Sequence, residues 1–239
     1  MKVRLSRPAV IIGIALGAVV LLGLAAIIVG SLAGPSASRT ATGPVNGART
    51  ATFQVLDGAT SMRFKAGSLG DDLYRVSVPA DAGIRPVVDR DGGDVRLRLL
   101  PASGGGSGIV DIVVNEKVGW ALRTLGGARE IRIDMTGGNL SEIHLAGGAS
   151  LIDVALPRPS AALPVITAGG VDQFRVRLPA GTPVRVTAAT GAGSVTVNGQ
   201  VHQGVVGGQS FTANGWQDGG PGVDVRAQAG AGVVQVSAG

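Results

Sequence analysis

Hydrophobic and polar residues alternate along most of the chain beyond residue 48. In Val95-Arg96-Leu97-Arg98-Leu99 and in Phe174-Arg175-Val176-Arg177-Leu178, every second residue is apolar and the residues between are basic. A period of two is typical of a strand with one buried and one solvated face. The same alternation recurs in the segments 62–65, 184–186, 195–197, 223–225 and 234–236. We therefore predict an all-β domain over residues 48–239 with no helix past residue 34.

Glycine pairs occur at a regular spacing in the middle of this domain. Pairs at 126–127, 137–138 and 147–148 each precede a short alternating strand, so that a corner and a strand recur about every ten residues. Such a fixed period is typical of stacked repeats, in which each unit packs on its neighbours.

A longer repeat is also visible. The segment 74–80 matches the segment 174–180 at an offset of one hundred residues, and 94–97 falls opposite 194–197 at the same offset. These matches suggest that the domain consists of two related halves of one continuous stack.

Two architectures are compatible with short strands joined by glycine and proline turns. One is a β-solenoid, similar to a parallel β-helix, and the other is an antiparallel β-sandwich. The chain has only 4 Phe, 2 Trp and 1 Tyr in 239 residues, so the core has to be mainly aliphatic. Repeated glycine corners and aliphatic strands favour the solenoid, and the sandwich remains the alternative.

The N-terminal part has a different character. Residues 1–8 contain Lys2, Arg4 and Arg7, and residues 9–33 form an uncharged apolar run long enough to span a bilayer. We expect a cytoplasmic basic N-terminus, a single transmembrane helix over 9–33 acting as a signal anchor, a flexible linker over 34–47 and an extracytoplasmic domain over 48–239. A cleaved signal peptide is the alternative for the apolar run. Gly13 and Gly17 form a GxxxG pattern that could support a homodimer.

Charge and cysteine content narrow the functional classes. The net charge of +5 becomes +2 after Lys2, Arg4 and Arg7 are set aside, because 18 basic residues then face 16 acidic ones. This slight excess argues against a nucleic-acid partner. The absence of cysteine excludes disulfides and thiolate metal sites.

Candidate catalytic residues are few. His144 and His202 are the only histidines, and their positions beside apolar residues predict that both point to solvent. Asp89, Asp91 and Asp94 surround a glycine turn, which we interpret as a polar turn rather than a calcium site. We expect no catalytic residue, no metal and no cofactor. The alternative is a carbohydrate-active β-helix enzyme that acts on envelope polysaccharide through these aspartates.

The candidate binding residues are basic side chains at outward positions of the alternating strands. In-register stacking of such strands would place these side chains in ladders suited to phosphate or carboxylate polymers. The candidates are Arg63, Lys65, Arg96, Arg98, Arg175, Arg177 and Arg185.

The glycine-pair strands at 126–156, the turn at 178–184 and the segment 193–199 resemble a bacterial extracytoplasmic β-strand-repeat family of adhesin-like proteins. They are similar also to the C-terminal domain of Lia-type cell-envelope stress proteins. The resemblance implies an extracytoplasmic β-helix with interaction or signalling roles, and it carries no catalytic residues. We thus expect a single-pass membrane protein of the bacterial cell envelope, acting as a scaffold, adhesin or stress accessory. Its partner would be an anionic envelope polymer or another membrane protein.

Overall fold

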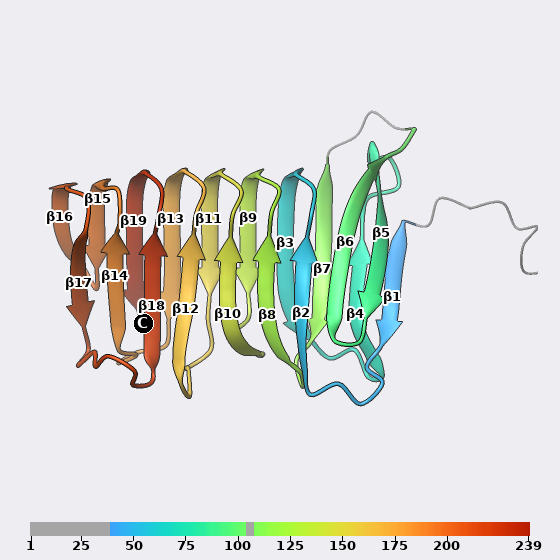
Figure 1. Ribbon diagram of the computed structural model, residues 1–239, viewed down its shortest axis with the longest axis horizontal. Helices are drawn as coiled ribbons and strands as arrows, with labels where there is room; N and C mark the ends of the chain where they lie inside the picture. Colours follow the sequence, from blue (N-terminus) through green and yellow to red (C-terminus); the bar gives the residue numbers. More distant parts are fainter. Residues whose placement is uncertain (1–38, 104–107) are drawn as a thin grey trace, which may run out of the picture. The chain divides into compact units, whose positions relative to one another are not determined.

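The computed structural model describes residues 39–103 and 108–239, which form one compact unit beginning at Arg39. These residues form 19 strands in two sheets and no helix, which confirms the all-β prediction (Figure 1). None of the described residues belongs to a helix that is long and apolar enough to cross a membrane. The predicted membrane segment 9–33, with Gly13 and Gly17, lies outside the described residues.

The two sheets lie face to face and differ by one strand. In spatial order the ten-stranded sheet consists of β1 (Thr40–Pro44), β4 (Asp72–Ser77), β7 (Ile109–Asn115), β3 (Ala59–Gly67), β9 (Ala128–Asp134), β11 (Ala149–Ala155), β13 (Val171–Leu178), β19 (Ala231–Ala238), β15 (Ala192–Val197) and β16 (Gln200–Val205). The nine-stranded sheet consists of β17 (Gln209–Ala213), β14 (Val184–Ala188), β18 (Gly222–Ala227), β12 (Ala162–Thr167), β10 (Asn139–Leu145), β8 (Gly119–Thr124), β2 (Thr50–Val55), β6 (Asp94–Pro101) and β5 (Ile84–Asp91).

Strand direction changes from the middle of each sheet to its ends. From β7 to β15 and from β6 to β14 all neighbours are parallel, because successive strands alternate between the two sheets. At the ends, β1, β4, β5, β16 and β17 add antiparallel pairs. The sheets are therefore mixed, and the purely antiparallel sandwich considered from the sequence is wrong.

Two strand pairs are placed out of chain order. The pair β2 and β3 lies between β6–β7 and β8–β9, and the pair β18 and β19 lies between β12–β13 and β14–β15 (Figure 1). The segments matched at an offset of one hundred residues occupy unlike settings, since β4 is antiparallel to its neighbours and β13 is parallel. Similarly, β6 belongs to the nine-stranded sheet, whereas β15 belongs to the ten-stranded sheet.

The glycine pairs form corners at two edges of the stack. The pairs 126–127 and 147–148 join a strand of the nine-stranded sheet to one of the ten-stranded sheet, whereas the pair 137–138 makes the return connection. Along the first edge the backbone hydrogen bonds continue through the corners, from Ala128 N to Gly148 O and from Ala149 N to Gly170 O. The ten-residue period is thus half of a full turn through both sheets.

The core lies between the sheets and is mainly aliphatic, as predicted. Alternating residues of each strand are buried, and Val, Ile and Leu supply most of the side chains. Most of the buried aromatic side chains gather around Phe53, whose ring meets Phe64 and Tyr74 edge-on at centroid distances of 6.0 and 5.9 Å, whereas Phe174 is buried separately on β13. Trp120 joins this group, is fully buried and donates its indole N–H to the carbonyl of Asn115.

The segment expected as a flexible linker is partly ordered. Residues 40–44 form β1, which pairs with β4, so the prediction of a linker reaching residue 47 is wrong for these residues. Arg39 fixes the start of β1 by donating to the carbonyl of Ala82 at 2.7 Å. The β structure thus begins before residue 48.

Candidate functional site

The seven basic candidates do not share one face. Arg63 and Lys65 on β3 and Arg175 and Arg177 on β13 lie on the outer face of the ten-stranded sheet. Arg96 and Arg98 on β6 and Arg185 on β14 belong to the nine-stranded sheet, on the opposite side of the core. Alternation correctly identified outward positions, but it did not reveal which sheet each strand joins.

Four candidates on the ten-stranded sheet fall into two in-register rows. Arg63 pairs in register with Arg132 of β9, which is followed across the sheet by Asp153 and Arg175. In the next row Lys65 stands opposite Asp134, and Ala155 stands opposite Arg177. Neighbouring strands lie about 4.8 Å apart. The rows therefore contain both cations and carboxylates, and Arg63 and Arg132 are adjacent cations in the first row.

Arg132 is the residue that the choice of candidates missed. It lies between buried Ile131 and Ile133 in the repeated glycine-pair strand, so the same alternation marks it as outward-facing. Its position between Arg63 and Asp153 makes it the central cation of the first row.

A shallow groove of about 450 Å³ runs across these rows. Its floor is formed by strand backbone and by the buried side chains beneath, and its sides are charged. The charged lining consists of Arg63, Lys65, Arg132 and Arg177 together with Asp111, Asp134 and Asp153.

The ion pairs of this face are exposed and only partly use its cations. Arg63 lies 3.7 Å from Asp111, and Arg177 lies 3.2 Å from Asp153. Exposed pairs of this kind contribute at most about 1 kcal/mol each and exchange readily with a competing anion. Arg175 donates to the amide oxygen of Gln173 at 2.6 Å but has no carboxylate partner among the described residues. Lys65 likewise has no ion pair within the described part of the chain. These two cations are free to bind an external anion.

Asp153 supplies a carboxylate at the centre of the same face. Its Oδ2 accepts from Arg177 at 3.2 Å, while its Oδ1 is buried without a hydrogen-bond partner. Because this oxygen is buried, Asp153 acts on the face mainly as the partner of Arg177. The accessible charged donors of the face are the cations.

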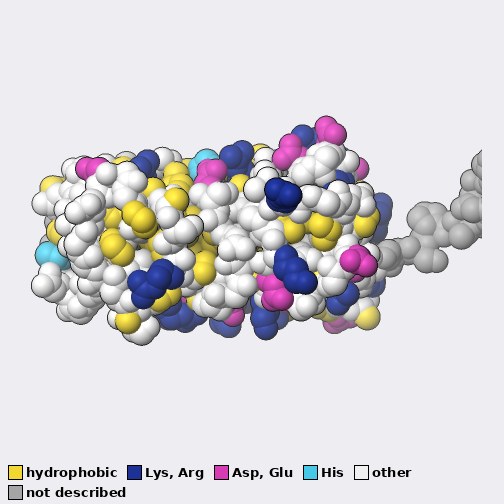
Figure 2. Space-filling view, turned by 90° about the horizontal axis from the view of Figure 1, so that it is seen from below, with side chains coloured by type: hydrophobic (Ala, Val, Ile, Leu, Met, Phe, Trp, Pro, Cys, Tyr) yellow, Lys and Arg dark blue, Asp and Glu magenta, His cyan; other side chains and the backbone are white. Residues whose placement is uncertain are grey.

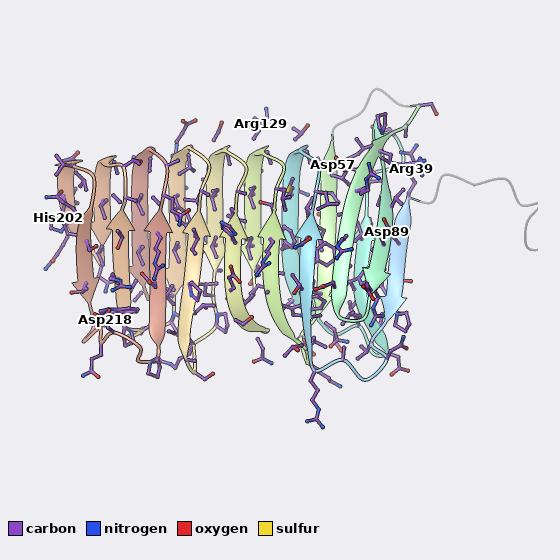
Figure 3. All side chains as sticks on the ribbon, in the orientation of Figure 1. Arg39, Asp57, Asp89, Arg129, His202 and Asp218 are labelled. Atoms are coloured by element: carbon purple, nitrogen blue, oxygen red, sulfur yellow. The ribbon has the colours of Figure 1, made fainter. Side chains whose placement is uncertain are left out.

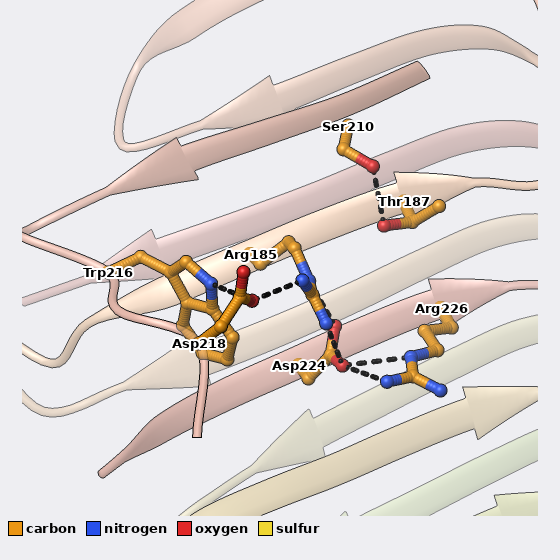
Figure 4. Close-up of polar contacts among 7 residues, drawn as sticks. All are labelled: Arg185, Thr187, Ser210, Trp216, Asp218, Asp224 and Arg226. Carbon is orange, nitrogen blue, oxygen red and sulfur yellow. Dashed lines mark hydrogen bonds and ion pairs between the residues drawn. The ribbon is translucent and has the colours of Figure 1, made fainter. Parts of the chain in front are cut away.

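Arg185 is engaged in a structural network and not in an open binding face (Figure 4). Its Nε and Nη2 bind both oxygens of Asp224 at 3.0 and 2.7 Å, and its Nη1 binds Asp218 at 2.6 Å. Its guanidinium carbon lies 5.0 Å from the ring centre of Trp216, and Arg226 binds Asp224 from the other side. The proposal of Arg185 as a free ligand-binding residue is therefore not supported by its contacts.

The network shifts two ionisation equilibria. Burial of Asp224 alone would raise its pKa, but hydrogen bonds and charge from Arg185 and Arg226 outweigh burial and hold that pKa below its usual value. The hydrogen bond to Asp224 raises the pKa of Arg185 in turn. Asp224 is therefore ionised and doubly paired at neutral pH.

Arg96 and Arg98 project from β6, near the other end of the nine-stranded sheet. Arg96 stands opposite Asp89 and Arg98 opposite Val87, and both arginine side chains are exposed. Neither takes part in an ion pair within the described residues. The core separates these two arginines from the groove.

The acidic turn and the histidines offer no catalytic arrangement. Asp91 stands opposite Asp94 beside the β5–β6 turn, and Asp89, labelled in Figure 3, lies on the edge strand β5. These aspartates are exposed, and within the described residues they are not part of a cluster of three or more acidic or histidine side chains that could hold a metal ion. Within residues 39–103 and 108–239, no group of three or more His, Cys, Asp and Glu residues is arranged to hold a metal ion.

The two histidines differ in orientation. His144 lies on the outer face of the nine-stranded sheet between buried Ile143 and Leu145, as predicted. The outward prediction for His202 is wrong. Its ring stacks on Phe211 at a centroid distance of 4.1 Å, across the gap between β16 and β17. The pair covers the end of the core.

Comparison with known proteins identifies the fold. No protein-family model matches the sequence, and no curated protein matches it. Among solved structures, the chain is similar to a "putative cell adhesion protein" from Clostridium sporogenes ATCC 15579, with a TM-score of 0.58 and 19% identity over 82% of this chain and 97% of that chain. A "putative adhesin" from Bacteroides fragilis NCTC 9343 aligns over 83% of this chain and 97% of that chain, but a TM-score of 0.24 and 8% identity are too low to indicate a common fold. The first similarity shows a common fold.

Proposed function

We propose that this chain is an adhesin-like interaction protein of the bacterial cell envelope, which binds an anionic envelope polymer through the outer face of the ten-stranded sheet. The observation that carries the proposal is the pair of in-register rows over the groove, which brings Arg63, Arg132 and Arg175 together with Lys65 and Arg177. A polymer with repeated phosphate or carboxylate groups suits a surface whose cations lie on β3, β9 and β13, at multiples of the strand spacing.

The scaffold fits such a role. Successive strands alternate between two sheets, as in a two-sheeted β-solenoid, and this arrangement gives a long, rigid outer face rather than an enclosed cavity. The solved structure with a similar fold is named as a putative cell adhesion protein, which agrees with an adhesin-like role here.

Location at the membrane is part of the proposal and rests on the sequence. The apolar run 9–33 after Lys2, Arg4 and Arg7 would anchor the chain once and leave the β domain outside the cytoplasm. A more specific role as an envelope-stress accessory rests on the resemblance to Lia-type proteins. The carbohydrate-active enzyme has no comparable support, because Asp89, Asp91 and Asp94 face no other carboxylate across a groove.

The test is a cosedimentation assay of residues 39–239 with isolated bacterial envelopes over a salt series. This segment is a compact unit with its own core, so it can be tested alone. Lys65→Glu combined with Arg175→Glu reverses two cations on the groove face that have no carboxylate partner among the residues that the structure describes. Arg96→Glu combined with Arg98→Glu is the matched control, because it makes the same charge change on the other sheet.

We expect binding by the wild type and by the control to weaken with salt, as expected for screened charges. The groove variant should bind at least about tenfold more weakly, which corresponds to about 1.4 kcal/mol. Equal losses in both variants would show that only the overall charge matters. Absence of binding by the wild type would remove the polymer proposal. Circular dichroism of each variant verifies that it is folded.

A further inference from the structure

The two ends of the strand stack differ in chemistry. At one end the edge strands are β1 and β5, which contain Pro44, Pro86, Arg85, Asp89 and Arg90. Prolines and charges are the usual means by which proteins prevent an edge strand from pairing with another chain. This end is therefore protected.

The other end has no such protection. Its edge strands are β16 and β17, each of which has a neighbour on only one side among the described strands. From residue 186 to residue 217 the sequence contains no Asp, Glu, Lys or Arg, and neither edge strand contains proline. Figure 2 shows this end of the molecule, at the left, as mostly uncharged surface.

Apolar side chains are exposed at the same end. The structure has four large exposed hydrophobic residues in its described part, and two of them, Val201 on β16 and Val206 just after it, lie here. They are 58% and 63% exposed, respectively. The stacked rings of His202 and Phe211, which close the core, are also only partly buried. Figure 3 labels His202 at this end, far along the stack from Asp89. A partner that continues the two sheets past this end would cover the rings of His202 and Phe211.

We propose that this end face, made by β16 and β17, is a docking surface for a second copy of this chain. In a dimer with a two-fold axis perpendicular to the sheets, each edge strand meets its own copy in antiparallel orientation. The strand β16 would pair with the partner's β16, and β17 would pair with the partner's β17. Such a contact extends both sheets across the interface and joins the two cores end to end.

The chemistry of the two ends specifies a closed dimer. A head-to-tail contact would place uncharged β16 against β1, which ends in Pro44, and uncharged β17 against β5, which is charged and contains Pro86, so that backbone pairing is hindered. Only the unprotected end is complementary to itself. Association should therefore stop at two copies rather than continue into a fibre.

The test is the mass of purified residues 39–239, measured by light scattering and sedimentation over a range of concentrations. Without residues 1–38, pairing through Gly13 and Gly17 cannot contribute. The variant of the proposed interface, called the end variant, combines Val201→Lys with His202→Lys. On β16 it places one positive charge on the outer face of the sheet and one on the face toward the core. The matched control is Ala41→Lys with Thr42→Lys, which does the same on the edge strand at the protected end.

We expect the wild type and the control to have twice the mass of one chain and to dissociate on dilution. The end variant should have the mass of one chain and should keep the circular dichroism of the wild type. A wild type that stays monomeric at every concentration would overturn the proposal. So would a dimer that persists in the end variant, or growth beyond two copies.

Hydrogen exchange of the wild type gives a measurement that does not depend on any variant. Backbone amides of β16 and β17 that do not donate to β15 or β14 should become more protected as concentration rises. If their exchange does not change with concentration, the dimer does not use this end. If the end instead binds an extended peptide while the chain stays monomeric, the second copy is the wrong occupant.

Discussion

Gly147 lies directly against Gly126 of the preceding corner. A Cβ placed on Gly147 would come within 2.4 Å of the carbonyl carbon and oxygen of Gly126. Gly169 meets the backbone of the corner at 147–148 in the same way, at 2.4 Å. These glycines are therefore required by the close approach of successive corners and not by an unusual backbone angle.

Substitution of Gly147 should be costly, whereas substitution of Gly137 should not. Gly147→Ala forces backbone against backbone and should lower the free energy of unfolding by about 2–3 kcal/mol. Gly137 belongs to a sequence pair of the same kind, but nothing lies within 4 Å of its Cβ position. Gly137→Ala should change stability by less than about 1 kcal/mol. Denaturant unfolding of both variants measures the difference, and equal losses would show that corner packing is not the cause.

The contrast between these glycines shows what the sequence could and could not predict. The period of glycine pairs predicted corners and short strands, because local conformation and alternation depend on neighbouring residues. Which glycine of a pair is packed depends on residues far along the chain, for Gly147 on a corner about twenty residues earlier, and the two insertions of β2–β3 and β18–β19 interrupt the simple order. The same insertions, and the alternation of successive strands between the sheets, explain why the seven outward cations lie on two faces and do not form one set of ladders.

Asn115 should be essential for the stability of the connection between β3 and β4. Its Nδ2 donates to the carbonyls of Gly70 and Asp72 at 3.1 and 2.8 Å, and its Oδ1 accepts from the backbone of Lys117. The side chain is only 2% exposed. Asn115→Ala leaves the carbonyls of Gly70 and Asp72 and the backbone N–H of Lys117 without this partner. It should lower the free energy of unfolding, measured by heat or denaturant, by about 2 kcal/mol. Asn139→Ala is the control, because the side chain of Asn139 makes one long, exposed hydrogen bond of 3.5 Å. Equal costs would contradict the role of burial.

His202 shows why alternation fails at the end of a stack. Its neighbour Val201 is apolar and was expected inside, so His202 was expected outside. Beyond β16 the described chain provides no further strand to cover the core, and the amphipathic imidazole ring occupies the inward position against Phe211. Position in the stack thus overrides the preference of valine for burial.

Removal of the Asp224 carboxylate should destabilise the C-terminal part of the nine-stranded sheet. The side chain of Asp224 is 6% exposed and is bound by both Arg185 and Arg226. Asp224→Asn leaves two arginines with a neutral partner and should lower the free energy of unfolding by about 2 kcal/mol. Asp218→Asn removes the other carboxylate at Arg185, but the side chain of Asp218 is 81% exposed, so its loss should stay below about 1 kcal/mol. The two variants are compared by thermal unfolding at pH 7, and a larger loss for Asp218→Asn would contradict this order.

The contribution of Asp224 should disappear in acid. Its arginine partners hold its pKa in the folded protein below the value of about 3.9 for an unfolded chain, so folding favours the ionised form. A group with a depressed pKa stabilises the folded state above its unfolded pKa and loses that contribution as the pH falls through the folded pKa. The difference in free energy of unfolding between wild type and Asp224→Asn should therefore be constant from pH 7 to about pH 5 and should shrink below about pH 4. The corresponding difference for Asn115→Ala should not change with pH in this way, because that variant removes no ionisable group. If the difference in free energy of unfolding between wild type and Asp224→Asn stayed constant down to pH 2, the charge of this carboxylate would not be what stabilises the network.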